Sequence, residues 1–170
     1  MGWSTFFFMD SGIPSFGLYQ QNKAFFLKIW WDTGYKMDKN ILFCLVVEDE
    51  PLAQQILEKY LECIEELQLV AKCETIEEAL MTLQSEQIDV VFLDIQLEAT
   101  LGTEIIGKMK QLSRRYYIVV TSARPAESLD TRKIFNQKNI IFVDYLTKPF
   151  SFDRFHAAIR KILTQEMSNE

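Results

Sequence analysis

Chemically useful side chains follow apolar runs at four places in this chain. Glu48 and Asp49 follow the run that begins at residue 41, and Asp94 follows a later run. Thr121 and Lys148 follow two further runs. If these runs form neighbouring parallel strands, their carboxyl ends lie along one edge of a sheet, where open parallel sheets bind ligands. We therefore expect three carboxylates, a hydroxyl and an ammonium group to converge on one pocket.

Three carboxylates at one site favour a bound cation. Held close together, they repel one another and partly protonate unless a cation joins them. Oxygen ligands favour a hard ion such as Mg²⁺, which binds through few carboxylates and keeps several waters. With the charge neutralised, one carboxylate becomes usable as a nucleophile toward phosphorus. Lys148 and Thr121 could then donate hydrogen bonds to the phosphoryl oxygens, so the set of residues indicates phosphoryl transfer to an aspartate.

Each of these residues also has a simpler interpretation. Acidic residues such as Glu48 often precede a helix, where they interact favourably with its dipole. Asp94 could be an ordinary turn residue, and Lys148 could be a solvated loop charge. The combination is more specific than any one residue, because the residues follow successive strands in order. His156 is the only histidine, which excludes a histidine-based hydrolase or a multi-histidine metal site.

The runs that carry these residues alternate with amphipathic segments. Predicted strands span residues 41–47, 69–73, 90–93, 117–120 and 140–146. Predicted helices begin near residues 51, 75 and 151 and span about 103–112 and 127–136. In the first helix, the apolar residues at helical spacing are Leu52, Ile56, Tyr60, Ile64 and Leu67. The alternation predicts an α/β fold, a doubly wound five-stranded parallel sheet with helices on both faces.

Residues 1–36 differ from the rest of the chain. They hold all three tryptophans and half of the aromatic residues, and no strand or helix period persists through them. Three interpretations are open: an appendage translated from upstream of a true start at Met37, an aromatic segment that packs on the domain or a partner, and a peptide that binds a membrane surface. We divide the chain into an N-terminal extension at 1–36, outside the domain, and a domain at 37–170.

Bulk composition excludes several classes of protein. A net charge of −6 argues against a large basic surface for nucleic acid. The 3 scattered cysteines are too few for a disulfide scaffold or a metal framework. No apolar run reaches the ~18–20 residues that a membrane-spanning helix needs, and the N-terminus lacks the positive start of a secretory signal. We therefore expect a cytoplasmic protein that binds neither a membrane nor nucleic acid.

Residues 40–165 resemble the response-regulator receiver family of two-component signalling. The residues that carry the resemblance are Val47-Glu48-Asp49-Glu50-Pro51, Phe92-Leu93-Asp94-Ile95-Gln96, Gly102, Val120-Thr121-Ser122-Ala123 and Tyr145-Leu146-Thr147-Lys148-Pro149-Phe150. The residues around Asp94 are particularly similar to those of receivers whose output is a LytTR-type DNA-binding domain. The resemblance implies a flavodoxin-like fold with strand order 2-1-3-4-5.

The resemblance also implies an acceptor and a metal site. Asp94 would be the phosphoacceptor and one of the Mg²⁺ ligands. Asp49 would bind the metal directly, and Glu48 would act through water. The backbone carbonyl of Gln96 would complete the protein ligands.

Residues at the last two strand ends would complete this implied site. Thr121 and Lys148 would contact the phosphoryl group during catalysis of the transfer. The peptide bond between Lys148 and Pro149 would be cis, a costly feature that usually marks a required geometry. Tyr145 matches the aromatic position that swings inward on activation in the family. Thr121 and Tyr145 are therefore the expected switch residues.

The resulting hypothesis is a signalling switch that receives its phosphoryl group from a sensor histidine kinase or a phosphotransfer protein. Such a chain is not an enzyme in the usual sense, since it catalyses only its own phosphorylation and dephosphorylation. Its downstream partner would be a separate protein or an output domain absent from this chain, and a second copy of the chain is a further candidate. Two alternatives are a degenerate receiver that binds partners without phosphorylation and an aspartate-nucleophile phosphatase. Gln96 counts against the phosphatase, which usually has a second acidic residue at that position.

Overall fold

The computed structural model describes residues 41–97, 100–101, 103–125 and 138–167. Its elements are β1 (Leu42–Val47), α3 (Pro51–Glu62), β2 (Leu67–Cys73), α4 (Ile76–Ser85), β3 (Val90–Asp94), β4 (Gln96–Leu97), β5 (Thr100–Leu101), α5 (Thr103–Met109), β6 (Tyr116–Ser122), β7 (Ile140–Thr147) and α7 (Phe152–Met167). The extension at 1–36 and the helix expected at 127–136 lie outside the described residues, so both stay predictions. Within the described part of the chain, no helix is both long and apolar enough to cross a membrane.

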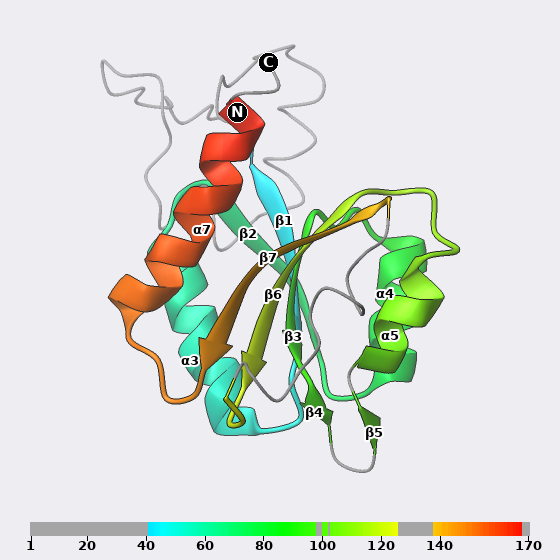
Figure 1. The fold of residues 1–170 in the computed structure, drawn as a ribbon, viewed down its shortest axis with the longest axis horizontal. Helices are drawn as coiled ribbons and strands as arrows, with labels where there is room; N and C mark the ends of the chain where they lie inside the picture. Colours follow the sequence, from blue (N-terminus) through cyan, green and yellow to red (C-terminus); the bar gives the residue numbers. More distant parts are fainter. Residues whose placement is uncertain (1–40, 98–99, 102, 126–137, 168–170) are drawn as a thin grey trace, which may run out of the picture. The chain divides into compact units, whose positions relative to one another are not determined.

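Five of the strands form one parallel sheet in the order β2-β1-β3-β6-β7 (Figure 1). This is the predicted order, because β6 and β7 are the fourth and fifth long strands along the chain. The two labels in between belong to a short antiparallel pair, β4 and β5, in which Gln96 lies opposite Leu101. The sequence did not predict this pair, since two residues are too few to show an alternating pattern.

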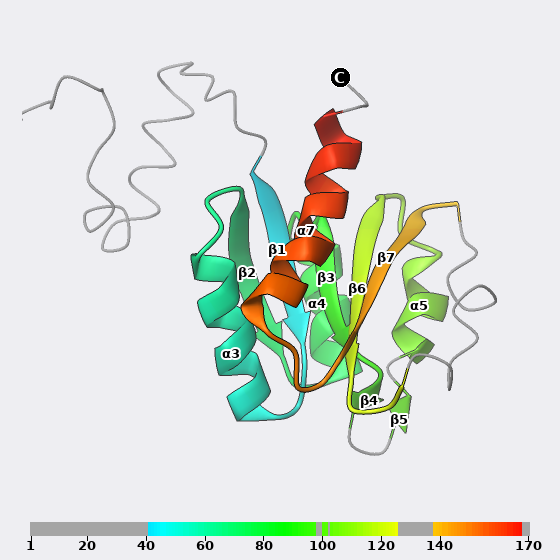
Figure 2. The same ribbon diagram turned by 60° about the vertical axis from the view of Figure 1, so that its left-hand side comes forward.

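Helices cover both faces of the sheet, as the alternation of elements predicted. Figures 1 and 2 show α3 and α7 on one face and α4 and α5 on the other. The side chains divide into two apolar clusters in the same way, one on each face of the sheet. Strands β3 and β6 are buried along their whole length. Continuous apolar runs are typical of parallel strands that are covered on both faces.

The apolar spacing in α3 does not mark its buried face. Leu52 and Ile56 are 62% and 40% exposed, whereas Leu57 and Leu61 are each 1% exposed. Packing of Leu57 and Leu61 on the sheet and a polar contact favour this rotation: the buried Gln54 side chain donates a 2.6 Å hydrogen bond to the main-chain carbonyl just after β1. The prediction was therefore wrong for Leu52 and Ile56, whereas Ile64 and Leu67 are buried but lie beyond the end of α3.

Asp144 joins α7 to the edge strand β7. Its carboxylate accepts hydrogen bonds from the Arg154 guanidinium at 2.7 and 2.8 Å and from the Lys161 ammonium at 2.6 Å. It also accepts from the backbone N–H of Tyr145 at 2.8 Å. Burial alone would raise the pKa of Asp144, but these hydrogen bonds outweigh it and lower the pKa to about 2. The contacts hold the strand that leads to Lys148.

We expect Asp144→Asn to lower the free energy of unfolding by about 1–2 kcal/mol at pH 7, because it weakens hydrogen bonds to a charged, buried acceptor. The pKa of Asp144 is lower in the folded chain than the ordinary value of about 3.9. Its contribution is therefore complete above about pH 4 and is lost as the pH falls toward 2. Urea unfolding should show a smaller difference in the free energy of unfolding between Asp144→Asn and wild type near pH 2.5 than at pH 7. Asp153→Asn, at an exposed position in α7, is the control. An equal loss at both pH values would contradict the assignment.

Candidate functional site

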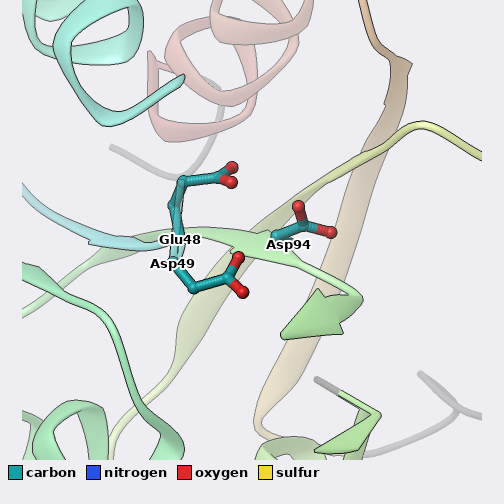
Figure 3. A group of neighbouring side chains, drawn as sticks. All are labelled: Glu48, Asp49 and Asp94. Atoms are coloured by element: carbon teal, nitrogen blue, oxygen red, sulfur yellow. The ribbon is translucent and has the colours of Figure 1, made fainter. Parts of the chain in front are cut away.

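Three carboxylates lie at the carboxyl ends of two neighbouring strands. Glu48 and Asp49 follow β1, and Asp94 is the last residue of β3, which pairs directly with β1. One oxygen from each carboxylate lies within 4.8 Å of the other two (Figure 3). Glu48 and Asp94 are buried, at 0% and 4% exposed, and Asp49 is half-buried. The sheet thus brings together the three acidic residues that the sequence singled out.

Lys148 lies between two of these carboxylates. Its ammonium group donates to Glu48 Oε2 and to Asp94 Oδ2, each at 2.5 Å. The residue directly follows β7, and its backbone N–H donates to the Ser122 carbonyl at 2.7 Å. The peptide bond between Lys148 and Pro149 is cis. One cation is therefore shared by two buried anions, and the cluster keeps a negative charge.

Burial and repulsion shift the ionisation of this cluster. Burial raises the pKa of Glu48 to about 7, with Asp94 adding to the rise and Lys148 opposing it. Burial also lowers the pKa of Lys148, but the hydrogen bonds to Asp94 and Glu48 outweigh it and raise the pKa. Lys148 thus stays charged at neutral pH. The pKa of Glu48 lies close to neutral pH, so this carboxylate takes up a proton far more readily than an exposed one. Such raised carboxylate pKa values are expected where like charges meet without a full complement of cations.

Thr121 and Gln96 lie on either side of the Asp94 carboxylate. Thr121 is paired with Asp94 in the β3–β6 register. Its hydroxyl is fully buried and has no hydrogen-bond partner among the described residues. On the other side, the Gln96 backbone N–H donates to Asp94 Oδ1 at 2.7 Å. A buried hydroxyl without a partner costs free energy, so this donor indicates a site for a further acceptor group.

Tyr145 points inward from β7. Its side chain is 8% exposed and packs in the apolar cluster that lies on the α4 and α5 face. Its hydroxyl donates to the Arg124 carbonyl at 2.9 Å. The Tyr145 side chain is thus linked to the segment that follows β6, the strand that carries Thr121.

The residues present fit a divalent cation of the kind the sequence predicted. Three carboxylates within 4.8 Å supply hard oxygen ligands, and their combined charge exceeds what Lys148 neutralises. Hard oxygen donors in this number suit Mg²⁺, which binds through one or two carboxylates and keeps several waters. Asp49 and Asp94 would hold such an ion directly and Glu48 through water, with the Gln96 backbone carbonyl as the further ligand that the family resemblance implies.

Three residues beside the site were not predicted to take part in it. Gln54 holds the main chain after β1. Ser122 and Arg124 link the loop after β3 to Tyr145. Ser122 stood within a motif that the sequence singled out, but residue type alone carries no signal of a side-chain hydrogen bond across strands.

A family comparison agrees with this fold. Residues 44–160 match the model of the response regulator receiver domain. The chain therefore belongs to the receiver family of two-component response regulators, as its motifs predicted.

Relatives of known name are similar over most of this chain. It is 35% identical over 127 residues to the sensory transduction protein LytR of Staphylococcus haemolyticus, a match covering 74% of this chain and 47% of that protein. It is 33% identical over 117 residues to the transcriptional regulatory protein MalR of Bacillus subtilis, covering 68% and 47%. The chain thus spans about half the length of the curated relatives it matches.

Solved structures show the same fold. The response regulatory domain of mrkE from Klebsiella pneumoniae superimposes with a TM-score of 0.62 at 24% identity, covering 73% of this chain and 97% of that one. The response regulator TrrA from Thermotoga maritima, solved in complex with Mg(2+)-BeF, superimposes with a TM-score of 0.59 at 26% identity, covering 71% and 98%.

Proposed function

We propose that this chain is a working phosphoacceptor: with Mg²⁺ present, Asp94 takes a phosphoryl group from a sensor histidine kinase or a phosphotransfer protein. The observation that carries the proposal is the convergence on Asp94 of two further carboxylates and the Lys148 ammonium. Thr121, whose buried hydroxyl has no partner among the described residues, is paired with Asp94 on the next strand. The complex of TrrA with Mg(2+)-BeF supports it, because that relative takes up the metal with a fluoride group. The function is that of a cytoplasmic signalling switch.

The chemistry follows from the positions of these groups. An Asp94 oxygen attacks phosphorus, and the bond between phosphorus and the donor's histidine nitrogen breaks, the nitrogen keeping the electron pair. Mg²⁺ bound to the acidic cluster would neutralise charge on the carboxylates and on the phosphoryl oxygens. Lys148, already 2.5 Å from Asp94 Oδ2, donates to the transferred group as its charge develops. Thr121 supplies a second donor from the adjacent strand.

Signalling would use the link between this site and Tyr145. Thr121 would donate to the phosphoryl group, and the strand that carries it continues to the Arg124 carbonyl, which accepts the Tyr145 hydroxyl. Phosphorylation would shift a pre-existing equilibrium between two arrangements of these residues. The response would pass to a separate target protein, to an output domain, or to a second copy of the chain.

The direct test is incubation with acetyl phosphate, with and without Mg²⁺, followed by intact mass measurement and peptide mapping. We expect one added phosphoryl group, located on Asp94, only when the metal is present. A chain that gains none, and also fails to bind Mg²⁺, would instead be a binding module that works without phosphorylation.

A further inference from the structure

A chain of four hydrogen bonds connects the Asp94 carboxylate to the Tyr145 hydroxyl. The Gln96 backbone N–H donates to Asp94 Oδ1 at 2.7 Å, and the Ser122 hydroxyl donates to Gln96 Oε1 at 3.2 Å. The Arg124 backbone N–H donates to Ser122 Oγ at 3.1 Å. The Tyr145 hydroxyl donates to the Arg124 carbonyl at 2.9 Å. Three of these four contacts measure between 2.7 and 3.1 Å, and the Ser122–Gln96 contact, at 3.2 Å, is the longest.

Ser122 is the middle of this series, and its hydroxyl both donates to the Gln96 side chain and accepts from the Arg124 backbone N–H. A serine hydroxyl has a single donor, and here the Gln96 side chain takes it. Ser122 is 0% exposed, so no bulk water competes for that donor. Its side chain therefore has one bonded arrangement in this state, and any other arrangement would break the link to the acceptor loop.

The main chain of Ser122 is tied to the reaction site as well. Its carbonyl accepts the Lys148 backbone N–H at 2.7 Å. It also directly follows Thr121, the residue whose buried hydroxyl lacks a partner among the described residues. A main-chain shift of Thr121 toward a phosphoryl group would also move Ser122, because the two are consecutive residues of β6.

We propose that Ser122 is a positioning residue that transmits the state of Asp94 to Tyr145 through its hydroxyl. The inference rests on the proposed function, since it takes Asp94 as the phosphoacceptor. A phosphoryl group on Asp94 changes the hydrogen bond that its carboxylate accepts from the Gln96 backbone N–H. Movement of the Gln96 main chain displaces its side chain, which then releases or redirects the Ser122 hydroxyl. The Arg124 main chain then moves, and the hydrogen bond to Tyr145 moves with it.

The test separates binding at Asp94 from the response at Tyr145. The full chain is labelled with fluorotyrosine, the Tyr145 signal is assigned by its loss in Tyr145→Phe, and Mg²⁺ with beryllofluoride serves as the probe. In wild type, the probe should shift the Tyr145 resonance. In Ser122→Ala, probe affinity should stay within about threefold of wild type, while the Tyr145 shift falls by at least about half. Ser151→Ala, which removes an exposed hydroxyl that caps the start of α7, should respond as wild type does.

A second variant keeps the test decisive if Ser122→Ala folds poorly. Gln96→Ala cuts the same series one step earlier and should reduce the Tyr145 shift similarly. The Tyr145 shift in the double variant should be no smaller than in either single variant, because the two substitutions remove the same link. A full Tyr145 shift in Ser122→Ala overturns the inference, and so does a wild-type chain that binds the probe with no shift. A wild-type chain that fails to bind the probe overturns the proposed function itself.

Discussion

An Asp94→Asn chain is expected to take up no phosphoryl group while keeping its fold. The amide has no anionic oxygen to attack phosphorus, so the acceptor is lost outright. Asparagine has nearly the same shape, and its carbonyl oxygen can still accept the hydrogen bond that the Gln96 N–H makes to Asp94. The change also removes one of three mutually repelling carboxylates. The melting temperature of the metal-free chain should therefore be equal to or higher than that of wild type.

Acetyl phosphate labelling followed by intact mass measurement gives the readout, under conditions that label wild type fully. Asp153→Asn is the matched control, because it makes the same chemical change at an exposed aspartate of α7. The control should be labelled at the wild-type rate. A phosphoryl group appearing in Asp94→Asn as fast as in wild type would show that another residue is the acceptor.

Lys148→Met should lower the rate of phosphoryl uptake by at least about 100-fold, the usual cost of removing one donor to a developing oxyanion. The lysine is the cationic donor beside Asp94, with its nitrogen 2.5 Å from Asp94 Oδ2. Methionine has a similar length and no charge. The rate measured with acetyl phosphate and saturating Mg²⁺ is the quantity to compare.

The same substitution should destabilise the metal-free chain by about 3 kcal/mol at pH 8, because it leaves two buried carboxylates without their shared cation. The effect should diminish at lower pH. Burial already raises the pKa of Glu48 to about 7, and loss of the ammonium group raises that pKa further. Glu48 has its ordinary pKa of 4.5 in the unfolded chain and a raised pKa in the folded variant. Between these two values the folded chain binds more protons than the unfolded chain, so lowering the pH from 8 to 5.5 stabilises the fold.

Urea unfolding at pH 8 and pH 5.5 measures this difference. Lys72→Met is the control, since Lys72 contacts Glu58 at 2.7 Å but both side chains are about one-third exposed, at 33% and 36%. That surface pair should contribute less than about 1 kcal/mol at either pH. A Lys148→Met chain as stable as wild type at pH 8 would mean that the two carboxylates do not depend on this lysine.

The strands were predictable because their sequence signal is local. A parallel strand covered on both faces reads as an unbroken apolar run, and β3 and β6 are such runs. The polar residues that end these runs were equally visible, so the acidic cluster and Lys148 could be chosen before any geometry was known. The paired strands β4 and β5 were not predictable, because elements of two residues have no measurable period.

The buried face of α3 could not be obtained in this way. Two apolar stripes run along this helix, one through Leu52 and Ile56 and another through Leu57 and Leu61. Periodicity does not distinguish them, since both repeat at intervals of four residues. The hydrogen bond from Gln54 to the end of β1 and packing against the sheet decide which stripe is buried.

The alternation of strands and helices, and the residue types at the strand ends, were evident before the fold was known, because both depend on neighbours along the chain. The contact of Lys148 with both Glu48 and Asp94, across separations of 100 and 54 residues, became apparent only in the folded chain. The same holds for the link from Gln96 through Ser122 to Tyr145. Such contacts depend on which strands pair and in what register, so they are set by the packing of the whole sheet rather than by any one segment.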